Sequence, residues 1–220
     1  AYLRGQILYR IAEMLEGRRE QFIAELKLQG ATQRAAQKEV DASIDRLIYF
    51  AGWADKYQQV FSAVNPVASS HFNFSVLEPT GVVSIIAPDD SGLLGLVSNV
   101  APTIVGGNTC VVLASESMPL SAVSFAEVLH ASDVPGGVVN ILTGLRSELT
   151  GHFASHMDVN AIVFCDGARK TARTVQELAS DNIKRVIARA GIDWGSESAQ
   201  HPYLIRDTQE VKTTWHPSGS

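Results

Sequence analysis

The sequence is poor in cysteine and carries no excess of positive charge. Only two of its 220 residues are cysteine, so a disulfide framework cannot hold the fold. Acidic residues outnumber basic ones by 23 to 18, and the net charge of −5 argues against a surface that binds nucleic acid. Apolar runs are short, and the one at 134–142 is interrupted by proline and glycine, so we expect no membrane-spanning helix.

The composition that is present is that of an ordinary globular domain. Hydrophobic residues make up 45% of the chain and charged residues 19%. Cys110 and Cys165 lie in strand-like apolar runs and are expected to be buried, reduced thiols, as suits a cytoplasmic protein. Arginine and glutamate near the N-terminus argue against a secretory signal, and the initial Ala1 is consistent with a piece of a longer chain.

The first third of the chain predicts two amphipathic helices. Apolar residues recur at helical spacing over 2–28 and again over 33–61. A strand is predicted over 71–77, where Phe72, Phe74 and Val76 alternate with polar residues.

From residue 82 onward, short apolar strands alternate with helices. Such alternation predicts a parallel sheet with helices on both faces, which is an α/β fold. The expected strands are 82–86, 109–113, 138–142 and 161–165, and the expected helices are 93–105, 121–131, 147–155 and 168–180. Residues 191–202 are expected to form a loop, and Tyr203 to Ile205 and Val211 to Trp215 favour β structure.

Three segments in a fixed order carry a resemblance to a known family. They are A-G-W-A-D-K at 51–56, G-V-V-S-I-I-A-P at 81–88 with G-N-T-C-V-V-L-A-S-E at 107–116, and P-G-G-V-V-N-I-L at 135–142. This order, from about residue 4 to 185, resembles the nucleotide-binding half of the aldehyde dehydrogenase superfamily. The resemblance implies a Rossmann-like doubly wound parallel sheet with two N-terminal helices and a small β oligomerisation arm.

The same resemblance suggests how the chain is divided. Residues 1–190 would form the nucleotide-binding domain, with 71–77 as a strand of the arm. Residues 191–220 would be a linker and a C-terminal oligomerisation strand, and the catalytic domain that the family places between them would be absent. This arrangement resembles the degenerate second copy of the fold in family-16 aldehyde dehydrogenases.

The family's catalytic positions are altered in this chain. An asparagine that stabilises the oxyanion corresponds to Asp90, which cannot donate a hydrogen bond when ionised. The general base corresponds to Arg189, and a guanidinium cannot accept a proton in water. Cys165 is the nearest candidate nucleophile, but Asp166 beside it would raise its pKa, so we assign no catalytic residue and no metal ligand.

The expected cofactor site keeps only part of the family's pattern. The resemblance assigns four residues to NAD: Ile86, Ser115, Glu116 and Gly167. Glu116 is half of a clamp on the adenosine ribose, and its lysine partner is replaced by Leu113. Asp166 stands at the first glycine of the phosphate turn and would repel a phosphate there. NAD binding is therefore expected to be weak or absent.

Two functions follow from these expectations. The first is a non-catalytic domain that assembles or stabilises a dehydrogenase, with a homodimer or a complete aldehyde dehydrogenase module as partner. The alternative is an NAD-dependent aldehyde oxidoreductase whose cysteine and base come from another chain or from a missing segment. In the first case the chain alone would not oxidise aldehydes, and neither case needs nucleic acid or a membrane.

Overall fold

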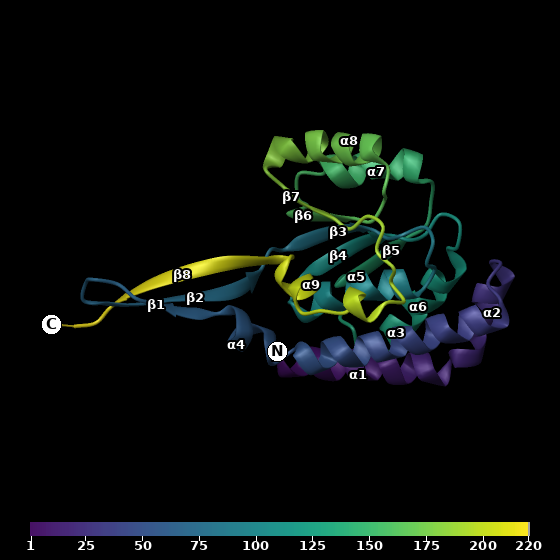
Figure 1. Ribbon diagram of the computed structural model, residues 1–220, viewed down its shortest axis with the longest axis horizontal. Helices are drawn as coiled ribbons and strands as arrows, with labels where there is room; N and C mark the ends of the chain where they lie inside the picture. The colour runs from purple at the N-terminus through teal and green to yellow at the C-terminus, as the bar shows by residue number, and fades with distance from the viewer. Residues whose placement is uncertain (220) are drawn as a thin grey trace.

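A body and a projecting arm make up the molecule (Figure 1). The structure is a computed structural model that describes residues 1–219. The body contains a parallel sheet between layers of helices, and the arm is a narrow antiparallel sheet whose far tip carries the C-terminal end (Figure 1).

The sheet of the body is parallel throughout and has the strand order β5-β4-β3-β6-β7. Its strands are β3 (Val82–Ile86), β4 (Thr109–Leu113), β5 (Val139–Leu142), β6 (Ala161–Phe164) and β7 (Arg185–Ala188). The order runs outward from β3 in one direction and then resumes at β6 in the other, as in a doubly wound sheet. The expected Rossmann-like α/β class is confirmed.

Helices cover both faces of this sheet (Figure 1). One layer contains α1 (Tyr2–Gly17), α2 (Arg19–Leu28), α3 (Gln33–Trp53), α5 (Leu94–Val105) and α6 (Leu120–Ala131), and the other contains α7 (Arg146–Ser155) and α8 (Arg169–Ala179). Every residue of α5 is buried, because this helix lies between the sheet and the outer helices α1 and α3. Within residues 1–219, no helix combines the length and the apolar character needed to cross a membrane.

The two expected N-terminal helices are each divided. The first ends at Gly17, and Arg18 leaves helical geometry with φ −109° and ψ 14° before α2 begins. The second ends at Trp53, and a turn separates it from the short helix α4 (Tyr57–Phe61). Apolar spacing continues through both breaks, which is why periodicity alone predicted unbroken helices.

Other differences concern short elements. Tyr203 to Ile205 was expected to favour β structure, but α9 (Tyr203–Arg206) is a helical turn that begins after Pro202 at φ −69°. Residues 191–202 are mostly irregular, as expected, and contain a 3-10 turn over Glu197–Ala199. Another 3-10 turn, Ser180–Asn182, follows α8. Strand β7 was not predicted, because four residues with a charged first member give too little alternation.

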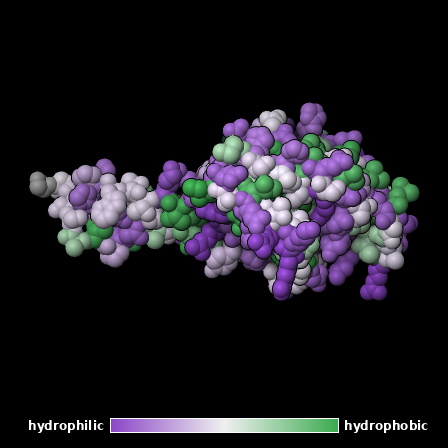
Figure 2. Space-filling model, turned by 90° about the horizontal axis from the view of Figure 1, so that it is seen from above, coloured by the Kyte–Doolittle hydropathy of each residue, from purple (hydrophilic) through white to green (hydrophobic). Residues whose placement is uncertain are grey.

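The arm consists of β1 (Ala63–Asn65), β2 (His71–Pro79) and β8 (Gln209–Pro217), in the order β1-β2-β8. Both the strand expected at 71–77 and the β-prone run at 211–215 therefore form strands, and they pair with each other from His71 with Pro217 to Pro79 with Gln209. Figure 2 shows the arm as a narrow projection with apolar and polar side chains mixed on its surface.

The N-terminus of α5 is held by a carboxylate from another helix. Glu39 Oε1 accepts hydrogen bonds from the backbone N–H groups of Leu93 at 3.0 Å and Leu94 at 3.1 Å, and from Ser91 Oγ at 2.9 Å. Ser91 Oγ accepts in turn from Gly95 N at 2.8 Å. Since the first N–H groups of a helix have no partner within it, and its dipole favours negative charge there, Glu39 fixes α3 against α5.

We predict that Glu39→Ala lowers the free energy of unfolding by about 1–2 kcal/mol, because two buried helix N–H groups lose their acceptor. Urea unfolding followed by circular dichroism measures the change. Gln37→Ala, on the exposed side of the same helix, is the matched control and should leave stability within about 0.5 kcal/mol. Equal stability of the two variants would contradict the role assigned to Glu39.

Candidate functional site

A cavity lies at the carboxyl edge of the parallel sheet, where the strand order reverses between β3 and β6. Open α/β sheets bind ligands at such a point, because the loops that leave the neighbouring strands diverge there. The cavity has a volume of about 380 Å³ and is lined by Pro88, Asp90, Cys165, Arg189, Gly191, Ile192, Asp193 and Trp194. A second hollow of about 250 Å³ shares Asp90 and the residues 192–194 with it and extends toward Glu39.

Three positions that the sequence singled out meet at this cavity. Asp90 follows β3, Cys165 follows β6 and Arg189 follows β7, so the parallel strands bring their carboxyl ends together. The three positions that the resemblance relates to catalysis thus lie together in one place, the candidate catalytic corner. The side chains found there decide what chemistry the corner can perform.

Arg189 is buried and held from two sides. Its Nη1 donates to Asn99 Oδ1 at 2.8 Å, and its Nη2 forms an ion pair with Asp207 Oδ2 at 3.0 Å. Only 4% of its side chain is exposed. A guanidinium has no lone pair to accept a proton, so this position can act as a fixed positive charge and not as a base.

Cys165 lies beside this group as a protonated thiol. Its Sγ is 3.7 Å from Asn99 Oδ1, and the residue is 8% exposed. Burial raises the pKa of the Cys165 thiol to about 12, and the nearby positive charge of Arg189 offsets only part of that effect. Because the thiolate is the nucleophilic form, Cys165 is not activated at neutral pH.

Two of the expected cofactor residues are engaged in internal hydrogen bonds. Ser115 is 3% exposed, and its Oγ lies 3.0 Å from Asp89 Oδ1. Glu116 Oε2 accepts from the backbone N–H of Arg146 at 2.7 Å, so its carboxylate caps the N-terminus of α7. Asp89 also accepts a hydrogen bond from Ser117 N at 3.0 Å. Burial alone would raise the pKa of Asp89, but these hydrogen bonds and the charge of Arg146 hold that pKa below its ordinary value.

The other two expected residues differ in exposure. Ile86 is fully buried at the end of β3, next to the fully buried Leu113. A lysine in place of Leu113 would have to carry its charge out of this apolar cluster. Gly167 is exposed, its backbone is not in the left-handed region, and a Cβ there would meet nothing within 4 Å. Asp166 Oδ1 accepts from Ala168 N at 2.9 Å, so a carboxylate already occupies the turn before α8.

Arg146 lies near the expected cofactor residues, and the sequence did not single it out. Its guanidinium donates to the backbone oxygen of Ala87 and lies 3.8 Å from Asp89 Oδ1, with 15% of the side chain exposed. The side chain thus crosses from the start of α7 to the loop after β3. A positive charge at the first position of a helix is unfavourable, because the helix dipole is positive at that end. An arginine at the start of a predicted helix could therefore have identified Arg146 from the sequence.

The segment after β7 closes the cavity on its outer side. Arg46, 3% exposed on α3, donates to the backbone oxygens of Trp194 at 2.9 Å and Ala199 at 3.0 Å and to Ser98 Oγ at 2.5 Å. Burial lowers the pKa of the Arg46 guanidinium from its ordinary value. These bonds fix the segment across α5, so the cavity wall is built by the chain itself. Residues 1–219 contain no group of three or more His, Cys, Asp or Glu side chains arranged to hold a metal ion.

Comparison with known proteins gives the family. The model of the aldehyde dehydrogenase family matches residues 1–193. The chain belongs to the aldehyde dehydrogenase family. Its curated relatives include the hydroxyisobutyraldehyde dehydrogenase of Mycolicibacterium austroafricanum, which is 35% identical over 87% of this chain and 37% of that protein. The cytosolic aldehyde dehydrogenase 1 of Elephantulus edwardii is 33% identical over 86% of this chain and 37% of its own length.

Solved aldehyde dehydrogenase structures agree with the fold. PnpE from Pseudomonas sp. WBC-3 superposes with a TM-score of 0.81 at 30% identity, covering 86% of this chain and 39% of PnpE. The NAD+ complex of an aldehyde dehydrogenase from Bacillus cereus has a TM-score of 0.81 at 26% identity, covering 86% and 38%. The chain thus spans well under half the length of these relatives, and the family match ends before α9 and β8.

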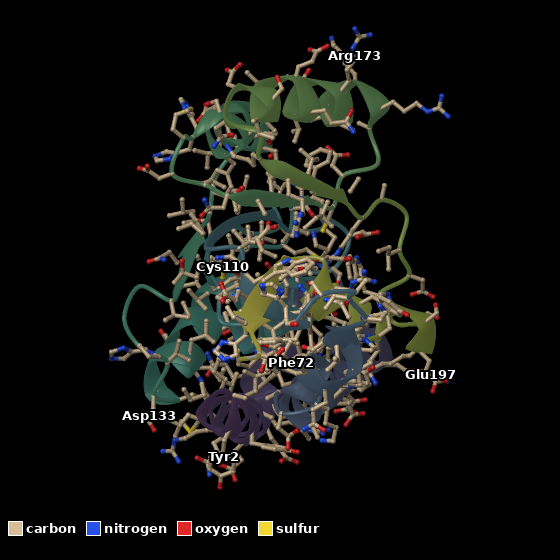
Figure 3. All side chains as sticks on the ribbon, turned by 90° about the vertical axis from the view of Figure 1, so that its left-hand side faces the viewer. Tyr2, Phe72, Cys110, Asp133, Arg173 and Glu197 are labelled. Atoms are coloured by element: carbon tan, nitrogen blue, oxygen red, sulfur yellow. The ribbon has the colours of Figure 1, made fainter. Side chains whose placement is uncertain are left out.

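Both cysteines of this family member should resist alkylation in the folded state. Burial raises the pKa of Cys110, like that of Cys165, to about 12, and Cys110 lies inside the body in Figure 3. At pH 8 we expect iodoacetamide to label neither thiol in the native protein and both in 8 M urea, as measured by intact mass.

The same shift fixes the sign of a pH effect. The Cys110 thiol has a pKa near 9 in the unfolded chain and about 12 in the folded protein. Its contribution to the free energy of unfolding is therefore fully present below pH 9 and is lost as the pH rises toward 12. Stability should therefore fall above about pH 9, and Cys110→Ala should reduce that dependence. Rapid native labelling that disappears in Cys165→Ala would show instead that Cys165 is a reactive thiol.

Proposed function

We propose that this chain is a non-catalytic aldehyde dehydrogenase domain that assembles or stabilises a dehydrogenase. The observation that carries the proposal is the state of the catalytic corner. The position of the base is held by Arg189 in an ion pair with Asp207, and the only thiol nearby is protonated. Acyl transfer to a thiol needs a thiolate and a proton acceptor, and this corner offers neither.

The arm supports the assembly part of the proposal. It projects away from the body, and it exposes large apolar side chains such as Phe72, Val64 and Trp215 (Figure 3 for Phe72). A homodimer or a complete aldehyde dehydrogenase module would cover this surface. A cytoplasmic location fits two buried, unpaired thiols.

The first test is turnover. Purified chain is incubated with NAD and with short and long aldehydes, and NADH formation is followed by absorbance. We expect no rate above that of buffer, since the corner contains no activated nucleophile. A rate that is lost in Cys165→Ala, and kept in Cys110→Ala, would refute the non-catalytic assignment.

The alternative is an NAD-binding oxidoreductase part that obtains its cysteine and base from elsewhere. It is favoured by the NAD+ complexes among the structural neighbours and by the retained crevice at the strand reversal. Against it stand the contacts of the expected cofactor residues. Arg146 reaches from α7 to the loop after β3, Glu116 caps α7, and the carboxylate of Asp166 occupies the turn to which the resemblance assigns a phosphate.

We predict that NAD binding is weak or absent in the unaltered chain and improves in Arg146→Ala combined with Asp166→Gly. The first change removes the side chain that reaches from α7 to the loop after β3, and the second removes the carboxylate at the α8 turn. Calorimetry measures the affinity, and Arg173→Ala on the exposed face of α8 is the control. Micromolar affinity of the unaltered chain would favour the oxidoreductase alternative.

A further inference from the structure

A cavity of about 370 Å³ lies between α7 and the parallel sheet. Strands β3, β4 and β5 form one wall of this α7 cavity, and α7 with the loop that follows it forms the other. It shares no lining residue with the cavity at the candidate catalytic corner, and none of the four residues that the resemblance assigns to NAD lines it. The α7 cavity is therefore a space that the site described above does not use.

The cavity arises because helices cover this face of the sheet incompletely. Helices α7 and α8 lie on the same side of the sheet (Figure 1), where α7 packs against β3 and α8 against β7. Strands β4 and β5 are less well covered there. Val111 on β4 is only half-buried, and Leu142 at the end of β5 is 43% exposed. Apolar side chains of two strands thus remain accessible beside α7.

The walls of the α7 cavity are almost wholly apolar. Leu149 and Phe153 of α7 lie opposite Val82 and Val111 of the sheet. Ser84, the one polar residue that the sheet contributes, is 1% exposed, and its Oγ donates to the backbone oxygen of Phe153 at 3.4 Å. Cavities of roughly 300–1,000 Å³ with apolar walls are those in which proteins bind small molecules. These walls suit an alkyl chain, which gains by leaving water.

A single negative charge lies at the rim of the α7 cavity. With histidine counted as neutral, Asp158 is the only charged residue of the lining. No ion pair within residues 1–219 includes its carboxylate. Lys184 is 6% exposed, and its Nζ donates to the backbone oxygens of Ala154 at 2.7 Å and His156 at 2.8 Å, so its charge is bound to the end of α7.

The rim therefore favours a cation over an anion. A positive group would meet the unpaired carboxylate of Asp158, whereas a negative group would be repelled by it. His152, exposed on α7 and also at the rim, has a ring nitrogen that can accept a hydrogen bond in the neutral imidazole. An ammonium group has three N–H donors for these two partners and for water.

We propose that the α7 cavity binds a primary alkylammonium ion, with the alkyl chain against β3, β4 and β5 and the ammonium group beside Asp158. Aliphatic amines are protonated near neutral pH, as lysine is. The chain supplies most of the affinity because it is removed from water, and the charge supplies selectivity. This binding is independent of the proposed assembly function, since it uses neither the arm nor a partner chain.

Calorimetry with butyl-, hexyl- and octylammonium tests the contribution of the chain. Affinity should rise about fourfold for each added methylene, which corresponds to about 0.8 kcal/mol. Octanoate and 1-octanol carry the same chain with other head groups. At low salt we expect octylammonium to bind most tightly and octanoate to bind about fivefold or more weakly than it, because only the carboxylate is repelled by Asp158.

A larger side chain in the wall tests the location. Val111→Phe fills part of the α7 cavity and should weaken octylammonium binding about tenfold or more. Val123→Phe is the matched control, since residue 123 is exposed on α6 in the other helix layer, and it should leave the affinity unchanged. Leu149→Phe fills the cavity from the side of α7, and it serves in place of Val111→Phe if circular dichroism shows that variant unfolded.

Asp158→Asn tests the charge. It should remove the preference for octylammonium over octanoate and leave the affinity for 1-octanol unchanged, because the walls are intact. Asp55→Asn, which removes an exposed carboxylate paired with Lys56 outside the cavity, is the control and should keep the preference.

Chain-length dependence that is lost in Val111→Phe, together with a preference lost in Asp158→Asn, supports the proposal. Equal affinities of Val111→Phe and Val123→Phe would place the amine elsewhere and overturn it. Octanoate binding as tightly as octylammonium to the unaltered chain would also overturn it, as would no detectable binding of octylammonium at millimolar concentration. None of these outcomes bears on the assembly function.

Discussion

The ion pair between Arg189 and Asp207 connects the parallel sheet of the body to the segment that leads into the arm. Arg189 follows the last strand of the parallel sheet, and Asp207 precedes β8 of the arm. On its other side the guanidinium binds Asn99 in the buried helix α5. A buried positive charge must be paired and hydrogen-bonded, so these contacts fix the arm and the interior helix relative to the sheet.

The sequence predicted the central sheet well because its signals are local. Strands β3 and β4 have the expected bounds, since each is a short apolar run between turn residues. The arm strands followed from β-prone residues and from the family resemblance. The breaks after Gly17 and Trp53, the short strand β7 and the helical turn α9 depend on packing between distant segments, which propensity and periodicity do not contain.

The sequence predicted some features of the candidate catalytic corner and missed others. Spacing along the chain placed Asp90, Cys165 and Arg189 at one edge, because parallel strands bring their carboxyl ends together. It could not show that Arg146 would reach the loop after β3 or that Glu39 would cap α5, since both side chains act on residues distant from them in the sequence. A motif comparison therefore overlooks residues that connect the loops around the corner.

The contacts of Arg189 at this corner help to stabilise the fold. A glutamate in place of Arg189 would set a buried carboxylate beside that of Asp207, which is 38% exposed, and the two negative charges would repel each other. Asn99 Oδ1, which accepts from the guanidinium, would also lose its donor. Placing a base at this position would thus require a compensating change at Asp207, because the charge of Arg189 connects the sheet to the segment before the arm strand β8.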